Sequence, residues 1–475
     1  MWKSKNSQWR NKFSESIASA HLSSEYANKS LEWFFDGVYK LAHNEESPID
    51  FDEKFYLHKN EDVKRAVVNG EQACGYIHFC IHGANEKRQW SYKNVYSQSK
   101  SEASLGKGLF YPKHLHGKNN WKKYTNEALR KENRSNVLVI LLPYLRSDLF
   151  FAGYTSFFDD ISDSFNLFDE VKVYVTNGAE NIDLLTKYGS NINAYNLDDI
   201  KLLDKRPSLI YCFDTETFFQ SIDIFDDISK TVYYCQDYEA GFSPFGSMYA
   251  RCQSALYKSK NIVFSTRFLR DFVKEQGLLA SKNSHITAPR IDIIDDIDLK
   301  KNKRLFFYFR PEAFNTRNMP EDILSSIMDF CEKYSGYELF LVGTVDTDYS
   351  YSVNNNRINV ISKLPKEEYI SLIKTCDVVV SLIYSAHPGV IAYQTAASGI
   401  PTVTNSFANR TEKELRHISE NIVTYDPIKD ELIERLEEAL QKKKGEMSFN
   451  YQKYSGIISD SSLKDFNHKI IKVKD

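Results

Sequence analysis

From residue 136 onward, short continuous apolar runs alternate with helix-length amphipathic segments. Uninterrupted runs of this length are typical of strands that helices cover on both faces, as in a parallel sheet. Five runs come first, and five more follow an Asp- and Lys-rich stretch at 285–304. The runs are VLVILL (137–142), VKVYVTN (171–177), SLIYCF (208–213), TVYYCQ (231–236) and NIVFST (261–266), then LFFYFR (305–310), YELFLVG (337–343), INVISK (358–363), DVVVSLI (377–383) and PTVTN (401–405). The pattern predicts an α/β protein with two doubly wound, Rossmann-like domains.

Four segments follow from this pattern. We expect a small helical module at 1–130, which ends in a Lys- and Asn-rich connector, and a first Rossmann-like domain at 131–290. A second Rossmann-like domain is expected at 291–455, and a C-terminal helix at 456–475 that returns to the first domain. Because open parallel sheets bind ligands beyond the carboxyl ends of their strands, two such domains facing each other predict a ligand cleft between them.

Composition narrows the function classes. The chain has 475 residues, 42% of them hydrophobic, and a net charge of -3 with both signs interspersed, which argues against a nucleic-acid partner. Its seven cysteines are an odd number scattered through apolar runs, the pattern of reduced thiols in a cytoplasmic protein. The longest apolar runs are far shorter than the roughly 18 residues that a membrane span needs. We therefore expect a cytoplasmic protein.

The segment SAHPGVIAYQTAASGIPTVTN (385–405) has the pattern of a turn, a short helix closed by Gly399, and a strand. His387, Pro388 and Gly389 are then expected at the start of the helix. Free backbone N–H groups at that point attract anions, and a glycine lets a phosphate approach the backbone closely. An ordinary βα turn without a ligand explains the pattern equally well.

Polar side chains follow other strands of the second series. Arg310 ends its first strand, Arg317 and Asn318 lie in the loop behind it, and Lys363 ends the third strand. All should point to the same sheet edge as His387, where they would supply charge-assisted hydrogen bonds to a diphosphate. Taken singly, each is as easily a solvated surface residue.

These residues carry a resemblance. LFLVG (339–343), SKLPKEEYISLIKTCDVVVSLIYSAHPG (362–389) and AASGIPTVTN (396–405) resemble the C-terminal half of family-4 GT-B glycosyltransferases. YYCQDYEAGFSPFGSMYA (233–250) and HPGVIAYQTAASGIPTVTNSFANR (387–410) are more closely similar to WsaF-type bacterial rhamnosyltransferases. FDEKFYLHKNEDV (51–63) and YIHFCIHGANEKR (76–88) resemble a small helical module found beside polysaccharide-making transferases.

The resemblance implies a GT-B enzyme that transfers a sugar, L-rhamnose from dTDP-L-rhamnose, to a glycan or lipid-linked glycan acceptor of a bacterial surface polysaccharide. It further implies retention of configuration, no protein nucleophile, no metal cofactor and peripheral contact with the membrane assembly machinery. Arg310 and Lys363 would hold the donor diphosphate, and residue 394 would contact the nucleotide or sugar. The family carries a glutamate at that position, whereas this chain has Gln394. A non-catalytic glycan-binding or scaffold protein of the same fold is therefore the main rival, and an epimerase or phosphorylase a second.

In the first series, Gly153 closes the loop LPYLRSDLFFAG (142–153), where related enzymes place an acceptor or a donor phosphate. A simple tight turn is the alternative. Asp237 and Glu239 directly follow a buried strand, so both should face the cleft as candidate catalytic bases for an acceptor hydroxyl. Capping of the following helical segment competes with that role.

Two patterns suggest metal binding only superficially. Asp346 and Asp348 form a DxD triplet, but they lie in what the sequence predicts to be a polar loop, DTDYSYSVNNN. His78 and His82 are four residues apart with Cys74 nearby, but no further pair of ligands follows at a suitable spacing. We expect no metal site in either place.

Overall fold

The computed structural model describes residues 53–68, 75–78, 86–89 and 134–472, apart from 148–149, 151, 178–181, 280–281, 346–347 and 458–461. In the N-terminal part these residues form helices α3 (Glu53–Lys59), α4 (Glu61–Val68) and α5 (Gly75–His78). His78 is buried there, and the Tyr56 hydroxyl lies 3.0 Å from its Nδ1. Cys74 and His82, its proposed companions in a metal site, lie outside the described residues, as do Asp346 and Thr347 of the DxD triplet.

The first domain is built on a seven-stranded parallel sheet in the order β3-β2-β1-β4-β5-β6-β7. Its strands are β1 (Arg134–Leu142), β2 (Glu170–Val175), β3 (Ile192–Asn196), β4 (Arg206–Cys212), β5 (Thr231–Cys235), β6 (Asn261–Phe264) and β7 (Asn283–Ile286). The chain reverses direction across the sheet between β1 and β4, which is the switch point of a Rossmann-like domain. All five strands predicted for this half are present, and the sheet contains β3 and β7 in addition.

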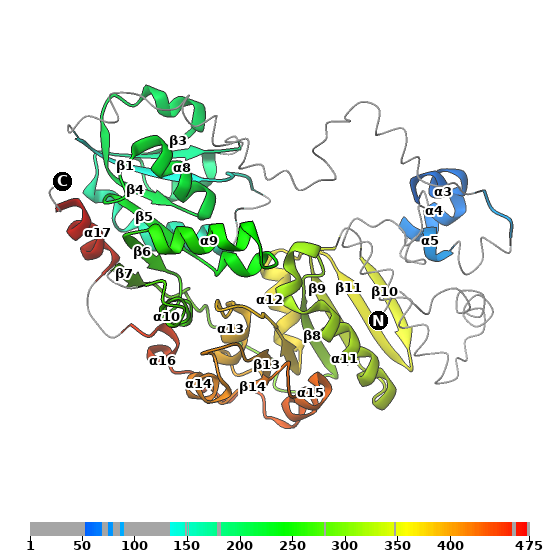
Figure 1. Ribbon diagram of the computed structural model, residues 1–475. Helices are drawn as coiled ribbons and strands as arrows, with labels where there is room; N and C mark the ends of the chain where they lie inside the picture. The colour runs from blue at the N-terminus through cyan, green and yellow to red at the C-terminus, as the bar shows by residue number, and fades with distance from the viewer. Residues whose placement is uncertain are drawn as a thin grey trace.

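Helices cover both faces of this sheet (Figure 1). They are α7 (Ala152–Ser162), α8 (Thr215–Phe225), α9 (Ser247–Lys258) and α10 (Arg267–Glu275), with the 3₁₀ turns η4 (Phe165–Leu167), η5 (Ile182–Tyr188), η6 (Leu197–Leu202) and η7 (Glu239–Phe242). At the start of α8, the Asp214 carboxylate accepts the Thr217 N–H and the Thr217 hydroxyl accepts the Asp214 N–H, which is a capping box. At the start of α10, the Thr266 hydroxyl accepts the Leu269 N–H.

The second domain repeats the plan in the order β10-β11-β9-β8-β12-β13-β14. Its strands are β8 (Arg304–Phe309), β9 (Glu338–Gly343), β10 (Tyr349–Val353), β11 (Asn356–Ile361), β12 (Val378–Val380), β13 (Thr402–Asn405) and β14 (Ile422–Tyr425). Six of them are parallel, and β10 pairs antiparallel to β11 at one edge. The predicted polar loop DTDYSYSVNNN is therefore wrong in its middle, because tyrosines 349 and 351 lie in this edge strand.

The helices of the second domain are α11 (Pro320–Lys333), α12 (Lys366–Thr375), α13 (Ile391–Ala397), α14 (Glu412–Ile418), α15 (Leu432–Gln441) and α16 (Tyr451–Ser455), with the turn η8 (Ala313–Asn318). Helices α11 and α15 pack with β8 and β9 in one core, while α12 and residues of the interdomain segment close the other face. The prediction of two doubly wound α/β domains is confirmed.

The last helix, α17 (Leu463–Lys472), packs on the first domain (Figure 1). Leu463, Phe466 and Ile470 are buried in the same core as β1, β2 and α7. Among the described cysteines, all five are buried free thiols: Cys212, Cys235, Cys252, Cys331 and Cys376. Within the described part of the chain, no helix is long and apolar enough to cross a bilayer.

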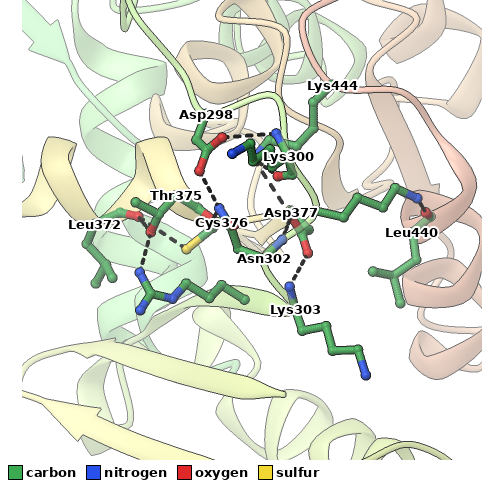
Figure 2. A network of polar contacts seen from close by, with 12 residues as sticks. Asp298, Lys300, Asn302, Lys303, Leu372, Thr375, Cys376, Asp377, Leu440 and Lys444 are labelled. Carbon is green, nitrogen blue, oxygen red and sulfur yellow. Dashed lines mark hydrogen bonds and ion pairs between the residues drawn. The ribbon is translucent and has the colours of Figure 1, made fainter. Parts of the chain in front are cut away.

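A polar network lies at the amino ends of β8 and β12, at the opposite end of the sheet from the predicted ligand edge (Figure 2). Asp377 accepts the backbone N–H groups of Asn302 and Lys303 at 3.0 and 2.7 Å. Lys444 lies 3.7 Å from the same carboxylate, and both side chains are buried. The network therefore holds residues 302–303, which lead into β8, and the C-terminal segment with Lys444 against the start of β12.

Candidate functional site between the two domains

A pocket of about 250 Å³ lies where the carboxyl ends of the two sheets meet. The first domain contributes Gly153, Gln236 and Asp237 to its lining, and the second contributes Arg317 and His387. Gln236 and Asp237 directly follow β5, while Arg317 and His387 lie in the loops after β8 and β12, which flank the switch point of the second sheet. This is the position at which doubly wound domains bind ligands.

A larger hollow of about 480 Å³ lies beside the carboxyl ends of β13 and β14. Its lining includes Tyr384, Phe407, Asp426 and Lys429, all from the second domain. Because it draws on one domain, and because Lys429 is already paired with Asp426 at 3.0 Å, we assign the site to the smaller interdomain pocket.

Asp237 connects the domains. Its Oδ1 accepts the hydroxyl of Ser385 at 2.6 Å and the backbone N–H of Tyr238 at 2.7 Å, and its Oδ2 lies 3.6 Å from Nε of Arg317. Ser385 and Arg317 belong to the second domain, so the predicted catalytic carboxylate faces the cleft and is already held by the opposite side.

Glu239 points away from this pocket, contrary to the expectation that both carboxylates face the cleft. Its Oε2 accepts the N–H of Thr215 at 2.9 Å, at the first turn of α8. Burial raises the pKa of Glu239 to about 8, and the nearby carboxyl of Asp214 adds to the rise. A carboxyl group in this position stabilises the start of a helix within the first domain, which differs from both roles expected for it.

Arg310 lies near Arg317: burial lowers the pKa of Arg317, and the positive charge of Arg310 lowers it further against the opposing effect of Asp237. The Arg317 guanidinium stacks 4.1 Å from the ring centroid of Phe242 and donates to Oδ1 of Asn315 at 2.8 Å. Arg310 forms an ion pair of 2.9 Å with the buried carboxylate of Glu312 and donates to the Tyr308 hydroxyl at 3.2 Å. Arg310 is therefore fixed in position by its own domain, whereas Arg317 is held by Asn315 of its own domain and by Phe242 of the first domain.

His387 precedes α13 as predicted, but it is not a cation at neutral pH. Its Nδ1 accepts the backbone N–H of Gly389 at 3.0 Å, so the ring proton of the neutral form is on Nε2. Burial lowers the pKa of His387, and the charges of Arg410 and Arg317 lower it further against the opposing effect of Asp237. Gly389 has a φ of +72°, which favours glycine at this turn.

Gln394 lies on α13 and turns toward the interdomain segment. Its Nε2 donates to the backbone carbonyl of Asp292 at 3.0 Å. A glutamate at this position could not donate that bond when ionised, so the amide has a structural role that the resemblance does not imply.

Three other residues predicted to contact the donor, Asn318, Pro388 and Lys363, do not line the interdomain pocket. Asn318 is buried and donates to the carbonyl of Leu382, which ties the loop after β8 to the strand beside it. Pro388 is buried and does not line the pocket, and Lys363 is an exposed residue beyond β11. Because β9 separates β11 from β8, Lys363 starts about 10 Å from the strand that carries Arg310.

Gly153 lines the pocket near the start of α7. A Cβ atom on this residue would lie 2.3 Å from Oε1 of Gln236. The glycine therefore admits the Gln236 side chain over the start of the helix, a role closer to side-chain packing than to the predicted phosphate contact.

The sequence pattern assigns no individual role to Ser385, Asn405 and Arg410, which shape the second-domain side of the site. Asn405 exchanges two hydrogen bonds with the backbone of Ile383, and the fully buried Arg410 donates to the same Ile383 carbonyl at 2.6 Å. All three residues fall within or next to the quoted stretch at 387–410. Their signal was a run of polar residues directly after two buried strands.

Residues 303–437 match the family model described as WsaF, C-terminal domain. The second domain is thus similar to the C-terminal domain of WsaF-type proteins. This WsaF-type domain carries Arg310, Arg317, Ser385 and His387. Together with the first Rossmann-like domain, it gives the chain the two-domain GT-B architecture of glycosyltransferases. No curated protein sequence matches the chain.

Solved structures with a similar fold are distant in sequence. HepE from Anabaena, in complex with UDP and glucose, is 10% identical, with a TM-score of 0.47, and the match covers 71% of this chain and 94% of HepE. Sucrose-phosphate synthase from Thermosynechococcus elongatus is 8% identical, with a TM-score of 0.44 and coverage of 71% and 94%. WaaG, a glycosyltransferase involved in lipopolysaccharide biosynthesis, is 12% identical, with a TM-score of 0.43 and coverage of 64% and 90%.

Proposed function

We propose that the chain is a glycosyltransferase that moves a sugar from a nucleotide diphosphate donor to a bacterial surface polysaccharide. L-Rhamnose is the proposed sugar, dTDP-L-rhamnose the proposed donor, and retention the proposed outcome at the anomeric carbon. The observation that carries the proposal is the interdomain pocket, in which Arg317 and His387 of the WsaF-type domain face Asp237 of the first domain. The acceptor is a glycan or lipid-linked glycan, handled at the cytoplasmic face of the membrane.

The proposed chemistry is positioning and charge stabilisation. Arg317 and Arg310 supply fixed positive charge where the leaving diphosphate develops negative charge, and such preorganised charge is worth several kcal/mol in a transition state. His387 offers a neutral Nε2–H donor beside them. Asp237 is the proposed proton acceptor for the attacking hydroxyl, whereas Glu239 contacts α8 instead.

Binding of nucleotide diphosphates tests the donor site. At 100 times its Kd, a ligand of the folded state stabilises it by about 2.7 kcal/mol, which thermal-shift screening of dTDP, UDP and GDP detects readily. Arg317→Ala should weaken binding of the best of them at least about tenfold, since it removes a charged partner worth about 1.5–3 kcal/mol. Arg357→Ala is the matched control, because Arg357 lies on β11 and donates to Asn359. No stabilisation by any of the three nucleotides would overturn the proposed donor site.

Turnover is a separate measurement. We expect the purified protein to release dTDP from dTDP-L-rhamnose, faster with a glycan acceptor present, and at a rate that EDTA does not change because arginines stabilise the leaving group. Loss of activity in EDTA that Mg²⁺ restores would contradict the metal-free chemistry.

A non-catalytic glycan-binding protein of the same fold is a second candidate, favoured by the hydrogen bond between Gln394 and Asp292. A scaffold of this kind would bind nucleotide or glycan but release no dTDP from any donor. The variant Gln394→Glu separates the two: an active enzyme loses the bond to Asp292 and changes its KM for the donor, whereas a scaffold stays inactive.

A further inference from the structure

The Asp237 carboxylate is held across the domain boundary in the way that a bound anion would be. It is buried, it accepts a short hydrogen bond of 2.6 Å from Ser385, and it lies 3.6 Å from the guanidinium of Arg317. Charge-assisted contacts of this kind are roughly twice as strong as neutral ones. All of the donors except the adjacent Tyr238 N–H come from the second domain.

The surroundings of this carboxylate are suited to a larger anion than one side chain. Arg410 is completely buried, and its charge, like that of Arg317, affects the ionisation of His387. Among the described residues, Nε and Nη1 of Arg410 have no hydrogen-bond partner. Burial lowers the pKa of Arg410, and Tyr393 and the carboxylate of Asp237 oppose that shift. Ser385 and Arg317 thus contact the single negative charge of Asp237, and Arg410 and His387 lie near enough to interact with it electrostatically.

The size of the pocket bears on what happens when a donor enters. Its volume of about 250 Å³ is below the roughly 300–1,000 Å³ of typical ligand pockets, and a nucleotide sugar is a large ligand. Asp237, on the first domain, lines that space together with Arg317 and contacts both Arg317 and Ser385 of the second domain. A diphosphate that binds Arg317 and Ser385 at the positions where they contact Asp237 therefore replaces the carboxylate.

We propose that the position now taken by the Asp237 carboxylate is a phosphate subsite of the nucleotide diphosphate, formed by Arg317 and Ser385, and that the donor displaces Asp237 from it. The inference rests on the proposed function and adds Ser385 as a donor ligand. Displacement of Asp237 also leaves its carboxylate without its cross-domain partners, so donor binding prepares the proposed base before the acceptor arrives.

Titration calorimetry with inorganic pyrophosphate and with dTDP, UDP and GDP tests the subsite. In Asp237→Asn the side chain keeps its shape but loses the charge that competes for Arg317, so pyrophosphate and the best nucleotide should bind about tenfold more tightly than to the wild type. Ser385→Ala removes a donor of the subsite and should weaken the same ligands about three- to tenfold. Asp237→Ala replaces Asp237→Asn if circular dichroism shows that the amide variant does not fold.

A control separates this effect from a general loosening of the domains. Glu414 forms another ion pair across the boundary, 2.9 Å from Arg267 and away from the pocket lining. Glu414→Gln should leave pyrophosphate affinity unchanged, and an equal gain in this variant would overturn the assignment.

The remaining outcomes are also decisive. Unchanged or weaker binding to Asp237→Asn, with normal nucleotide binding by the wild type, overturns the shared subsite and leaves the proposed function intact. Tighter binding to Asp237→Asn without any loss in Ser385→Ala means that the carboxylate only repels the anion, which also overturns it. If the wild type binds neither pyrophosphate nor any of the nucleotides, the proposed function fails together with the subsite.

Discussion

At the scale of single residues, Gly343 shows the strictest requirement for the absence of a side chain among the glycines that the structure describes. It ends β9 beside the last residue of β8, and a Cβ atom there would lie 1.5 Å from the carbonyl oxygen of Phe309. That carbonyl immediately precedes Arg310, so a forced shift would also move a proposed diphosphate ligand. The apolar run alone marks a strand end at this glycine and does not reveal the close approach.

We predict that Gly343→Ala destabilises the second domain by about 2–3 kcal/mol or more, because the backbone must move to admit one methyl group. Urea denaturation followed by fluorescence measures the change. Gly246→Ala is the control, since the nearest atom to its new Cβ is 3.8 Å away, and it should lie within about 0.5 kcal/mol of the wild type. Equal stability of the two variants would contradict the close contact.

Glu239 gives a prediction about pH. The folded protein keeps its proton up to about pH 8, whereas an unconstrained glutamate releases it near 4.5. Between these values the folded state binds more protons than the unfolded chain, so the free energy of unfolding falls as the pH rises. Each unit of pKa difference corresponds to about 1.4 kcal/mol, so the decline amounts to several kcal/mol.

Glu239→Gln should remove most of this decline, since an amide keeps an acceptor for the Thr215 N–H and does not ionise. Denaturant melts at pH 5, 6.5 and 8 measure it. The exposed Glu275→Gln should follow the wild-type curve. A wild-type stability that does not fall between pH 5 and 8 would show that the carboxyl is not buried as described.

At the scale of elements, the apolar pattern predicts the central strands of each sheet but not the edge strands. The four strands that the apolar pattern did not reveal are β3, β7, β10 and β14, and these are the four edge strands of the two sheets. Edge strands are short, and one side of each faces solvent, so INAYN, NSHI and YSYSV lack a continuous apolar run. Helices α11 and α12 lie between strands, where the sequence predicts helix-length amphipathic segments.

The network around Lys444 and Asp377 is a second element-scale feature, and it serves stability. Burial lowers the pKa of Lys444, which is held as a cation by the carboxylate beside it. We predict that Lys444→Met costs about 3–5 kcal/mol, because removing one member of a buried pair leaves the other charge uncompensated. Pyrophosphate affinity should not change, because Lys444 does not line the interdomain pocket.

Lys442→Met provides the comparison for Lys444→Met. Lys442 is half-buried and donates to the Glu420 carbonyl, a surface hydrogen bond, so its replacement should cost less than about 1 kcal/mol. Thermal melts and pyrophosphate titrations of the two variants together separate the structural end of the sheet from the ligand end. A fall in affinity confined to Lys444→Met would place the network in the binding machinery.

At the scale of the whole molecule, the sequence indicates which strand ends carry chemistry but not which of them meet. Arg317, His387 and Asp237 were expected at the cleft because each follows a buried strand, and they line one pocket. The pairing of Asp237 with Ser385 joins residues 148 positions apart, and no local pattern encodes it. Glu239 has the same signal two residues after Asp237, yet the 3₁₀ turn η7 directs it back into its own domain.

The return of α17 to the first domain is also a whole-molecule feature, because the chain passes through the second domain before completing the first. Asn467 accepts a hydrogen bond from the Tyr211 hydroxyl at 2.7 Å and donates one to Ser164, and the buried Lys230 donates to the Ile470 and Ile471 carbonyls.

We predict that Phe466→Ala costs the first domain about 3 kcal/mol through the cavity that it leaves. Calorimetry should show an earlier transition for that domain alone, while a nucleotide still shifts the transition of the second. His468→Ala, an exposed change on the same helix, should leave both transitions in place. An equal shift of both domains in Phe466→Ala would mean instead that the two unfold as one cooperative unit.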